Sequence, residues 1–562
     1  MPTARAPAGA GDHAPSEAGS EAAVGRRLLR SSAVVGFGTS VSRVTGFARF
    51  AAITYALGGG TAVAGTYGYA SQTPSMLYEL LLGGVLTATL VPIFVRHLER
   101  DDDTAISAVF TVSALVLVGM TVVGVALAPW VVQVFTLRLE GPDRAAQQEL
   151  ATTLLRLFMP MILFFGLIAL SSALLNARRR FAAAAITPVL NNVVVIAVFL
   201  TLPRLADGPI TVRSVRDDTP LLLLIGLGTT AGVAAVALAL FPVLRQAGSR
   251  LRFVPAVRHP AVRSMARLSG WTLGYVVANQ IALSFVLVLA NSESGALVYL
   301  TAYAFFQLPH GLLAVSLTTT IAPEMASAAG RSDLETLRNR LSLGLRLIAV
   351  VVLPAGAAYI GLARPMVVAL LERGAFSPSD SAIVADTVAA FAVGLVFFSW
   401  YLFSLRAFYA LPDTRTPFLL NCFENAVNVA LAIPLYAWLG IPGLALSFSA
   451  AYLAAAAVTL AVLRRRIGGI DGKALATTLA RVAIVGAGVA GVAWLCARSL
   501  GWDGTGRAAL TTAVGIVACG VVTLAGLVAL RAPELAVLRT LVPGQRVATE
   551  RNGGAAAPPP KV

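Results

Sequence analysis

Long apolar stretches, separated by short polar breaks, run through most of the chain. Most are at least about 20 residues long, the length an α-helix needs to cross a bilayer. A spanning segment must satisfy its backbone hydrogen bonds internally, so each stretch predicts a transmembrane helix. The predicted spans lie at roughly 32–57, 67–95, 104–130, 150–174, 182–202, 221–244, 271–290, 296–322, 341–362, 382–404, 416–437, 441–462, 475–496 and 508–530. The pattern therefore predicts an all-α polytopic membrane protein with about fourteen transmembrane helices.

The composition and the distribution of charge support this interpretation. Hydrophobic residues make up 57% of the chain and charged residues 12%, whereas a soluble domain carries about 25% charged residues. A net charge of +16 is also typical of nucleic-acid binding. The basic residues are not gathered into one region, however, and lie in alternate loops between apolar segments. We therefore expect no nucleic-acid partner.

The alternation of basic loops also predicts the orientation in the membrane. The N-terminal tail and every second loop after it are basic, including the run Arg178–Arg180 and the loop 245–268. Three of the intervening loops, at 58–66, 291–295 and 438–443, contain no basic residue. Basic loops stay on the cytoplasmic side, so we expect an even number of spans and both termini in the cytoplasm.

Two short sequence matches indicate an internal repeat. Gln72-Thr-Pro74 matches Gln307-Leu-Pro309, 235 residues later, and the segment 187–191 resembles 416–421, 229 residues later. These matches predict two homologous six-helix lobes plus two extra C-terminal helices, with chance similarity as the alternative. The expected divisions are a disordered cytoplasmic tail (1–30), an N-lobe (31–245), a basic cytoplasmic linker (246–268), a C-lobe (269–466), two additional helices (467–532) and a second disordered cytoplasmic tail (533–562).

Charged residues in the first span are the strongest functional candidates, because ionisable groups inside a membrane are costly. One helical stripe, about 120° wide, contains Ser42, Arg43, Gly46 and Arg49. Two arginines beside a hydroxyl and a small glycine suit an anion such as a phosphate, since guanidinium groups offer paired donors. The alternative is that one or both arginines extend to the membrane interface.

Glu79 in the second span is a further ionisable candidate. We expect it to be the counter-charge of an arginine in the first span, because an unpaired carboxylate there would become protonated. The alternative is a proton-coupling site.

Amide and acidic side chains in two later spans form a separate polar group. The eleventh span contains Asn421, Glu424, Asn425 and Asn428, and the seventh contains Asn279. Such oxygens are ligands for small cations, which makes Na⁺ or H⁺ coupling one interpretation, with the membrane potential as another driving force. Hydrogen bonding between helices is the commoner use of membrane asparagines and is the interpretation we prefer.

Motifs for catalysis and cofactor binding are absent from the sequence. There is no nucleotide-binding loop, nucleophile elbow or zinc-protease motif, and the three cysteines and four histidines lack metal-binding spacing. We therefore expect a transporter with no enzymatic activity, cofactor or certain metal site.

Several segments resemble a known family. The run SRVTGFAR (42–49) is similar to the signature of the MurJ/MviN family of lipid II flippases, and YELLLGGVLT (78–87) looks like its actinobacterial branch. The resemblance covers roughly residues 30–530. Further similar segments are VPIFV (91–95), NARRRF (176–181), TPVLNN (187–192), QLPHGLLAVSL (307–317) and RAFYALPDTRTP (406–417).

The resemblance implies a fold and a function. It implies two six-helix lobes around a V-shaped cationic cavity, and a lipid groove formed by the last two helices. The implied substrate is lipid II, an undecaprenyl-pyrophosphate linked to a disaccharide-pentapeptide, carried to the outer leaflet by alternating access. The implied surroundings are the bacterial cell membrane, its lipids and the proteins of cell-wall synthesis. By position, the implied substrate-binding residues are Ser42, Arg43, Gly46, Arg49, Pro188 and Arg481.

The chain also departs from the family pattern. Enterobacterial members carry another cavity arginine in the second helix, where this chain has Tyr78-Glu79, and an Asp-Arg pair in the eighth, where it has Tyr303-Ala304. They also carry an acidic residue near Gly65. Two cavity arginines, rather than four, must therefore neutralise the pyrophosphate. The alternatives are a flippase for another undecaprenyl-linked glycan, an exporter of cationic drugs similar to the MATE family, and a non-transporting cell-wall scaffold.

Overall fold

The computed structural model describes residues 38 and 41–541, except for 80–83, 101, 141–143, 179, 250, 261–269 and 294. Within this part of the chain every regular element is a helix. Twelve of the described helices are long and apolar enough to cross a membrane. The first two predicted spans fall on a helix over 41–57 and on α2 and α3, which residues outside the description interrupt. The all-α polytopic fold is confirmed, and the count of fourteen spans stays a prediction.

After the helix over 41–57, the elements follow in one order along the chain. They are α2 (Ala62–Tyr78), α3 (Gly84–Leu98), α4 (Asp103–Phe135), α5 (Arg144–Phe158), α6 (Met161–Ala177), α7 (Phe181–Ile186), α8 (Pro188–Leu205), α9 (Val212–Asp217), α10 (Thr219–Gln246), α12 (Gly270–Ala290), η2 (Asn291–Glu293), α13 (Ala296–Pro309), the π-helical η3 (His310–Ala314), α14 (Val315–Gly330), α15 (Leu334–Leu371), α16 (Pro378–Ala410), α17 (Arg415–Leu439), α18 (Ile441–Arg466), α19 (Gly472–Leu500), α20 (Thr505–Ala529) and α21 (Glu534–Leu541).

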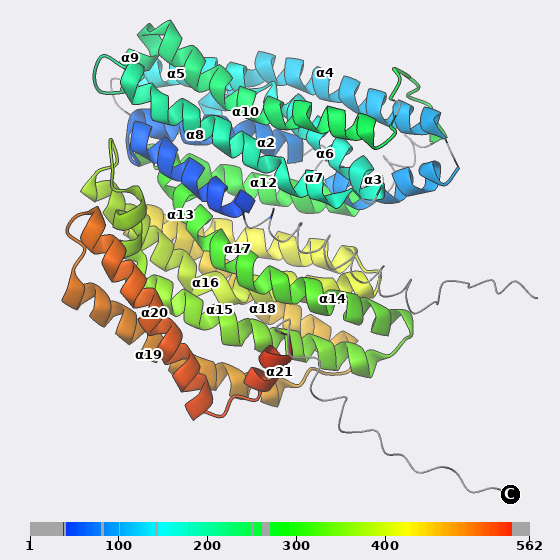
Figure 1. Cartoon of the computed structure of the whole chain (residues 1–562), viewed down its shortest axis with the longest axis vertical. Coiled ribbons are helices and arrows are strands. Elements are labelled where there is room, and N and C mark those ends of the chain that lie inside the picture. The colour runs from blue at the N-terminus through cyan, green and yellow to red at the C-terminus, as the bar shows by residue number, and fades with distance from the viewer. Residues whose placement is uncertain are drawn as a thin grey trace, which may run out of the picture.

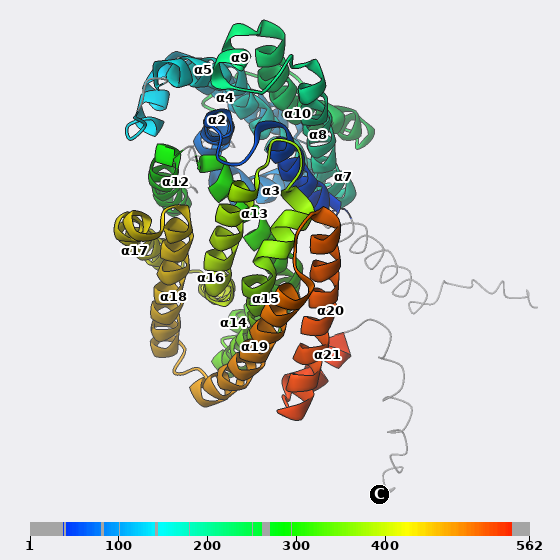
Figure 2. The same ribbon diagram turned by 90° about the vertical axis from the view of Figure 1, so that its left-hand side faces the viewer.

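The helices form two groups, which Figure 1 shows one above the other. We call the helix over 41–57 and α2–α10 the N-lobe, and α12–α18 the C-lobe. Helix α12 packs mainly against α17 and also reaches α3 and α4 of the N-lobe. Figure 2 shows α12, α17 and α18 on one side of the molecule and α19 and α20 on the other, where both pack against α15. The last two long helices therefore lie outside the interface between the lobes.

Small residues allow the long helices of the C-lobe to approach closely, as is common in membrane bundles. Gly394 of α16 faces α18, and a β-carbon at this position would lie 2.6 Å from Cα of Ser449. On the outer side of α15, a β-carbon at Gly361 would lie 2.9 Å from the backbone nitrogen of Trp494 in α19. Larger side chains at these two positions would push the helices apart.

Part of the predicted linker at 246–268 is fixed against the N-lobe. The backbone N–H of Arg252 donates to Oγ of Ser107 (3.2 Å), and that of Val254 donates to Oγ1 of Thr111 (3.0 Å). The hydroxyl of Thr111 in turn donates to the carbonyl of Arg252 (3.3 Å). These residues connect the segment after α10 to α4.

The prediction of a disordered tail from residue 533 was wrong for its first residues, because α21 occupies Glu534–Leu541. Glu534 is only 2% exposed. Its Oε1 accepts hydrogen bonds from Oγ1 of Thr478 (2.8 Å) and Nη1 of Arg346 (3.3 Å). The polar composition that suggested disorder does not reveal these partners, which lie far away in the sequence.

Candidate functional site

The two lobes contact each other closely at one end of the molecule, which we call the turn end because it contains the turn at 58–61. The carboxylate of Asp380 accepts hydrogen bonds from the backbone N–H groups of Gly59 (3.1 Å) and Gly60 (2.8 Å). The backbone N–H of Ala375 donates to the carbonyl of Tyr55 (2.9 Å). These bonds join the first turn of the N-lobe to the loop between α15 and α16.

Gly374 makes the contact at the turn end sterically feasible. Its φ of +65° lies in the left-handed region, which favours glycine. A β-carbon here would overlap the backbone oxygen of Tyr55.

A further hydrogen bond across the interface runs from Nδ2 of Asn291 to the backbone carbonyl of Phe135 (3.0 Å). The opposite end of the N-lobe, which contains Arg178 and Arg180, is called the arginine end below.

Asn192 of α8 fixes the helix that contains the two candidate arginines. Its Nδ2 donates to the carbonyl of Ser42 (3.2 Å) and to Oγ1 of Thr45 (3.0 Å). A β-carbon at Gly46 would lie 3.6 Å from the same Nδ2, an ordinary contact distance. Ser42 and Gly46 therefore lie where the first helix packs on α8.

Arg43 extends from the N-lobe to the C-lobe. Its Nη1 donates to the backbone carbonyl of Gln307 at 3.5 Å, a long hydrogen bond. A β-carbon at Gly311 would overlap the guanidinium group, so this glycine leaves the space that Arg43 occupies. Gln307 and Gly311 flank the junction of α13 and the π-helical turn. Arg43 thus links the lobes between the turn end and the arginine end.

Arg49 lines a cavity of about 260 Å³ in the N-lobe wall of the interface. Its Nε is buried and has no hydrogen-bond partner among the described residues. Its Cζ lies 5.3 Å from the ring centre of Phe50. The polar side chains that share the cavity with Arg49 are Tyr67, Ser71, Gln72, Ser75, Asn191 and Thr229. A cation with an unused donor at a cavity wall is suited to binding an anion.

A second cavity, of about 470 Å³, is lined by both lobes. It shares Phe50, Gln72 and Leu300 with the first cavity, so the two form adjacent parts of one interface. Gln72 and Gln307, the corresponding glutamines of the internal repeat, both line it. Its remaining polar side chains include Glu79, Asn279, Gln280, Tyr303, Glu424 and Asn425.

The partner of Glu79 differs from the one expected. The carboxylate accepts a hydrogen bond from Nε2 of Gln280 in α12 (2.5 Å), and within the described part of the chain no ion pair joins it to Arg43 or Arg49. The expected pairing with a first-helix arginine is therefore absent. The physical reason is that the two side chains contact different helices of the C-lobe. Glu79 contacts α12, whereas Arg43 contacts the end of α13.

The asparagines of α17 connect three helices. Oδ1 of Asn279 in α12 accepts hydrogen bonds from Nδ2 of Asn421 and Nδ2 of Asn425, both at 2.9 Å. Ser447 in α18 donates to Oδ1 of Asn428 (2.9 Å). This arrangement supports the preferred interpretation, hydrogen bonding between helices. Glu424 is 2% exposed and lines the cavity between the lobes, beside these amides.

Five of the six residues carried over from the family resemblance lie outside both cavity linings: Ser42, Arg43, Gly46, Pro188 and Arg481. Pro188 begins α8 directly after α7, and the two together form one span over Phe181–Leu205. Arg481 belongs to α19, which packs on the outer side of α15. At the positions of the expected Asp-Arg pair, Tyr303 and Ala304 line the second cavity, and the Tyr303 hydroxyl accepts from Nε2 of Gln307 (2.5 Å).

Sequence reasoning did not identify most of the uncharged cavity residues. Gln72, Gln280 and Gln307 are ordinary polar residues in apolar spans and carry no charge signal. The Gln-x-Pro repeat was the one available signal, since it marked equivalent positions in the two lobes. The contact of Asp380 with the turn end had no such signal, because its partners are backbone groups.

Comparisons with known proteins agree with this architecture. The family model for the lipid II flippase MurJ matches residues 53–505. The chain is 28% identical to a probable lipid II flippase MurJ of Rhizobium meliloti (strain 1021), covering 74% of this chain and 77% of the relative. It is 30% identical to a probable lipid II flippase MurJ of Synechocystis sp. (strain ATCC 27184 / PCC 6803 / Kazusa), covering 79% and 83%.

Solved structures show the same fold. A lipid II flippase MurJ in an inward closed conformation aligns with a TM-score of 0.71 and 19% identity, over 88% of this chain and 99% of that one. An inward-facing multidrug resistance MATE family transporter of the MOP superfamily aligns with a TM-score of 0.61 and 16% identity, over 76% and 94%. At these identities both likenesses concern the fold alone. Because the family model covers most of its length, the chain belongs to the MurJ family.

Proposed function

We propose that this chain is a flippase that moves lipid II from the inner to the outer leaflet of the bacterial cell membrane. Family membership and the similarity to proteins named as lipid II flippases support the substrate. The observation that carries the proposal is Arg49, a cation with an unused donor among the described residues, on the wall of a cavity next to the lobe interface.

In this proposal the two first-helix arginines bind the pyrophosphate. Arg49 lines the cavity and its buried Nε has no partner among the described residues, and Arg43 makes one long hydrogen bond that a phosphate oxygen can replace. The amides of Gln72, Gln280 and Gln307 can both donate and accept, which suits the hydroxyl and amide groups of a disaccharide-pentapeptide. Another undecaprenyl-linked glycan would satisfy the same groups and is the second candidate.

Transport would proceed by movement of one lobe against the other. We infer that the arginine end faces the cytoplasm, because basic loops remain on that side. The bonds of Asp380 and Tyr55 at the turn end would then close the outer side, and breaking them would open it. Proteins of cell-wall synthesis are proposed partners on the outer side.

Glu424 is the proposed coupling group. It is a buried carboxylate at the cavity wall, beside Asn279, Asn421 and Asn425, and Oδ1 of Asn421 has no partner among the described residues. A proton or Na⁺ can neutralise such a carboxylate and alter the interface between α12 and α17. The membrane potential is the alternative driving force.

A reconstituted system tests the proposed function. The purified full chain would be placed in vesicles of phosphatidylethanolamine and phosphatidylglycerol that contain lipid II, with a membrane potential of either sign. We expect the chain to change the fraction of lipid II accessible to an external enzyme, and Arg49→Ala to prevent this change. Equal accessibility with and without the chain, under both potentials, would contradict the proposal.

A further inference from the structure

Two neighbouring hollows lie at the arginine end of the N-lobe, and neither includes a residue that lines the cavities between the lobes. The first, of about 520 Å³, is bordered by the ends of α3, α4, α6, α7 and α10. The second, of about 660 Å³, lies between α3 and the α6–α7 segment. Leu98 lines both hollows, and Ala177 of the second directly precedes Arg178 of the first. The two hollows therefore adjoin each other at Leu98.

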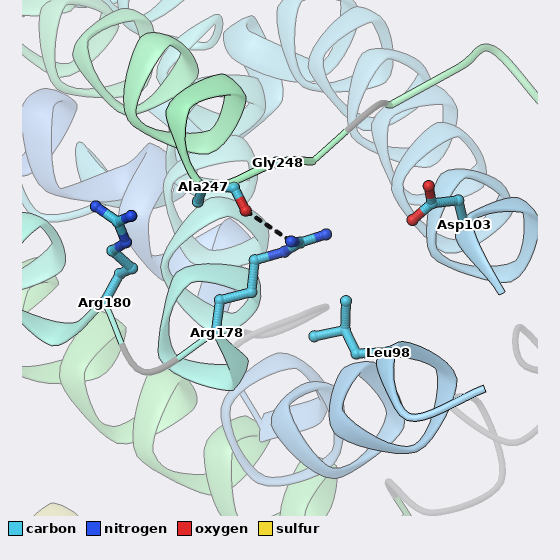
Figure 3. A pocket seen from close by; sticks show the side chains of 6 residues that line it. All are labelled: Leu98, Asp103, Arg178, Arg180, Ala247 and Gly248. Atoms are coloured by element: carbon cyan, nitrogen blue, oxygen red, sulfur yellow. Dashed lines mark hydrogen bonds between the residues drawn. The ribbon is translucent and has the colours of Figure 1, made fainter. Parts of the chain in front are cut away.

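The first hollow presents guanidinium groups in a fixed position. Nη1 of Arg178 donates to the carbonyl of Ala247 (2.6 Å), while its Nε is buried without a hydrogen-bond partner among the residues described. Figure 3 shows this guanidinium group below Ala247, with Arg180 on one side and Asp103 on the other. A β-carbon at Gly248, where φ is +79°, would lie 3.3 Å from Nη1 of Arg178. The backbone thus holds Arg178 and leaves other donors unused.

The chemistry of the first hollow favours a phosphodiester. A guanidinium group donates parallel hydrogen bonds to phosphate oxygens. Two arginines and the carboxylate of Asp103 line the first hollow, and the carboxylate of Glu99 lines the second. A phosphodiester carries one negative charge, so these two carboxylates repel it less than they would repel a pyrophosphate, which carries more.

The second hollow offers an apolar surface, although Glu99 and Asn176 also line it. Val91 and Val95 lie one helical turn apart on α3 and therefore on the same face. Phe181 closes the other side and is 43% exposed. An apolar surface of this kind binds hydrocarbon groups, so a ligand that fills both hollows must be an amphiphile.

We propose that the two hollows form one binding site for a membrane phospholipid. The head-group phosphate binds Arg178 and Arg180, and one acyl chain lies along Val91, Val95 and Phe181. The location at helix ends fits this ligand, because basic pockets at the ends of transmembrane helices bind lipid head groups. The site does not depend on the proposed transport function, since it shares no residue with the cavities that contain Arg49 or Glu79.

Native mass spectrometry of the purified full chain in detergent tests this site, with phosphatidylglycerol as the probe. We expect Arg178→Gln and Arg180→Gln each to weaken phosphatidylglycerol binding about tenfold, the effect of losing one charge-assisted hydrogen bond. Val95→Asp should weaken binding similarly. Arg465→Gln, which alters an exposed arginine at the end of α18, is the matched control and should bind as the unaltered chain does.

Three outcomes would overturn the proposal. The first is unchanged phosphatidylglycerol binding in both arginine variants. Arg180 is exposed, so its replacement is not expected to disturb folding even if that of Arg178 does. The second is equal binding of glycerol 3-phosphate and the intact lipid, which would mean that the apolar hollow contributes nothing. The third is loss of lipid II binding, rather than phosphatidylglycerol binding, in these variants.

Discussion

At the scale of single residues, the two first-helix arginines occupy different surroundings. Arg43 already reaches the C-lobe through the carbonyl of Gln307, whereas Nε of Arg49 has no partner among the described residues. We therefore expect Arg43 to respond to the position of the lobes and Arg49 to be the freer anion ligand. Both roles need the planar donor geometry of arginine, which lysine lacks.

Replacing either arginine should prevent growth of a strain that depends on this chain. Losing one charge-assisted hydrogen bond costs about 1.5–3 kcal/mol, or roughly a 10- to 150-fold loss of substrate occupancy. We expect Arg43→Ala and Arg49→Ala to fail in complementation, and the lysine variants to be partly active. Membrane abundance would be measured in parallel, with Arg258→Ala in the exposed linker as the control. Full growth with both alanine variants would favour the scaffold alternative.

Glu79→Gln separates a hydrogen-bonding role from proton coupling. The carboxylate accepts from Nε2 of Gln280, and the carbonyl of a glutamine side chain can accept the same bond. We therefore expect Glu79→Gln to retain transport within a few-fold, and Glu79→Ala to lose more. An inactive Glu79→Gln at normal abundance would instead show that the group must release or take up a proton.

The sequence revealed the charged part of the site but not its partners. Arg43 and Arg49 were identifiable because a charge in an apolar span is rare. Gln280 was identifiable only as an amide beside Asn279 in an apolar span, and its partner was not, because its bond to Glu79 joins residues 201 positions apart. The turn-end contact of Asp380 was missed because its partners are the backbone N–H groups of Gly59 and Gly60.

At the scale of elements, the predicted spans gave the helices but not their ends. The span at 341–362 lies inside α15, which begins at Leu334 because the carboxylate of Asp333 caps it by accepting from the backbone N–H of Thr336 (2.9 Å). The fifth span is one run over Phe181–Leu205, in which Pro188, which lacks a backbone N–H, separates α7 from α8. Hydrophobicity marks the part of a helix that suits the membrane, whereas caps and prolines decide where the helix begins and ends.

Helix α21 should detach when its buried ion pair is broken. The side chain of Glu534 is 2% exposed and contacts Arg346 and Thr478. Removing one partner of a buried ion pair costs about 3–5 kcal/mol of stability. We expect Arg346→Ala to speed amide hydrogen exchange in 534–541. The double variant Arg346→Met with Glu534→Leu leaves no buried charge and should restore much of the protection. Unchanged exchange in Arg346→Ala would contradict the anchoring role of Glu534.

At the scale of the whole molecule, the orientation can be tested directly. Basic loops predict that a reporter inserted at 291–295 is external and one at 250–260 is cytoplasmic. The turn end, where Asn291 meets Phe135, would then be the outer side. The reverse result at either site would contradict both the two-lobe topology and the proposed outer closure.

The central claim is that the interface between the lobes, with Arg43 and Arg49 of the first helix, carries lipid II across the membrane. The most direct measurement is the amount of lipid II accessible at the outer face of cells after depletion of this chain. We predict that accessibility falls on depletion, recovers with the unaltered chain, and does not recover with Arg43→Ala or Arg49→Ala at equal abundance. Unchanged accessibility after depletion, or full recovery with both variants, would contradict the account.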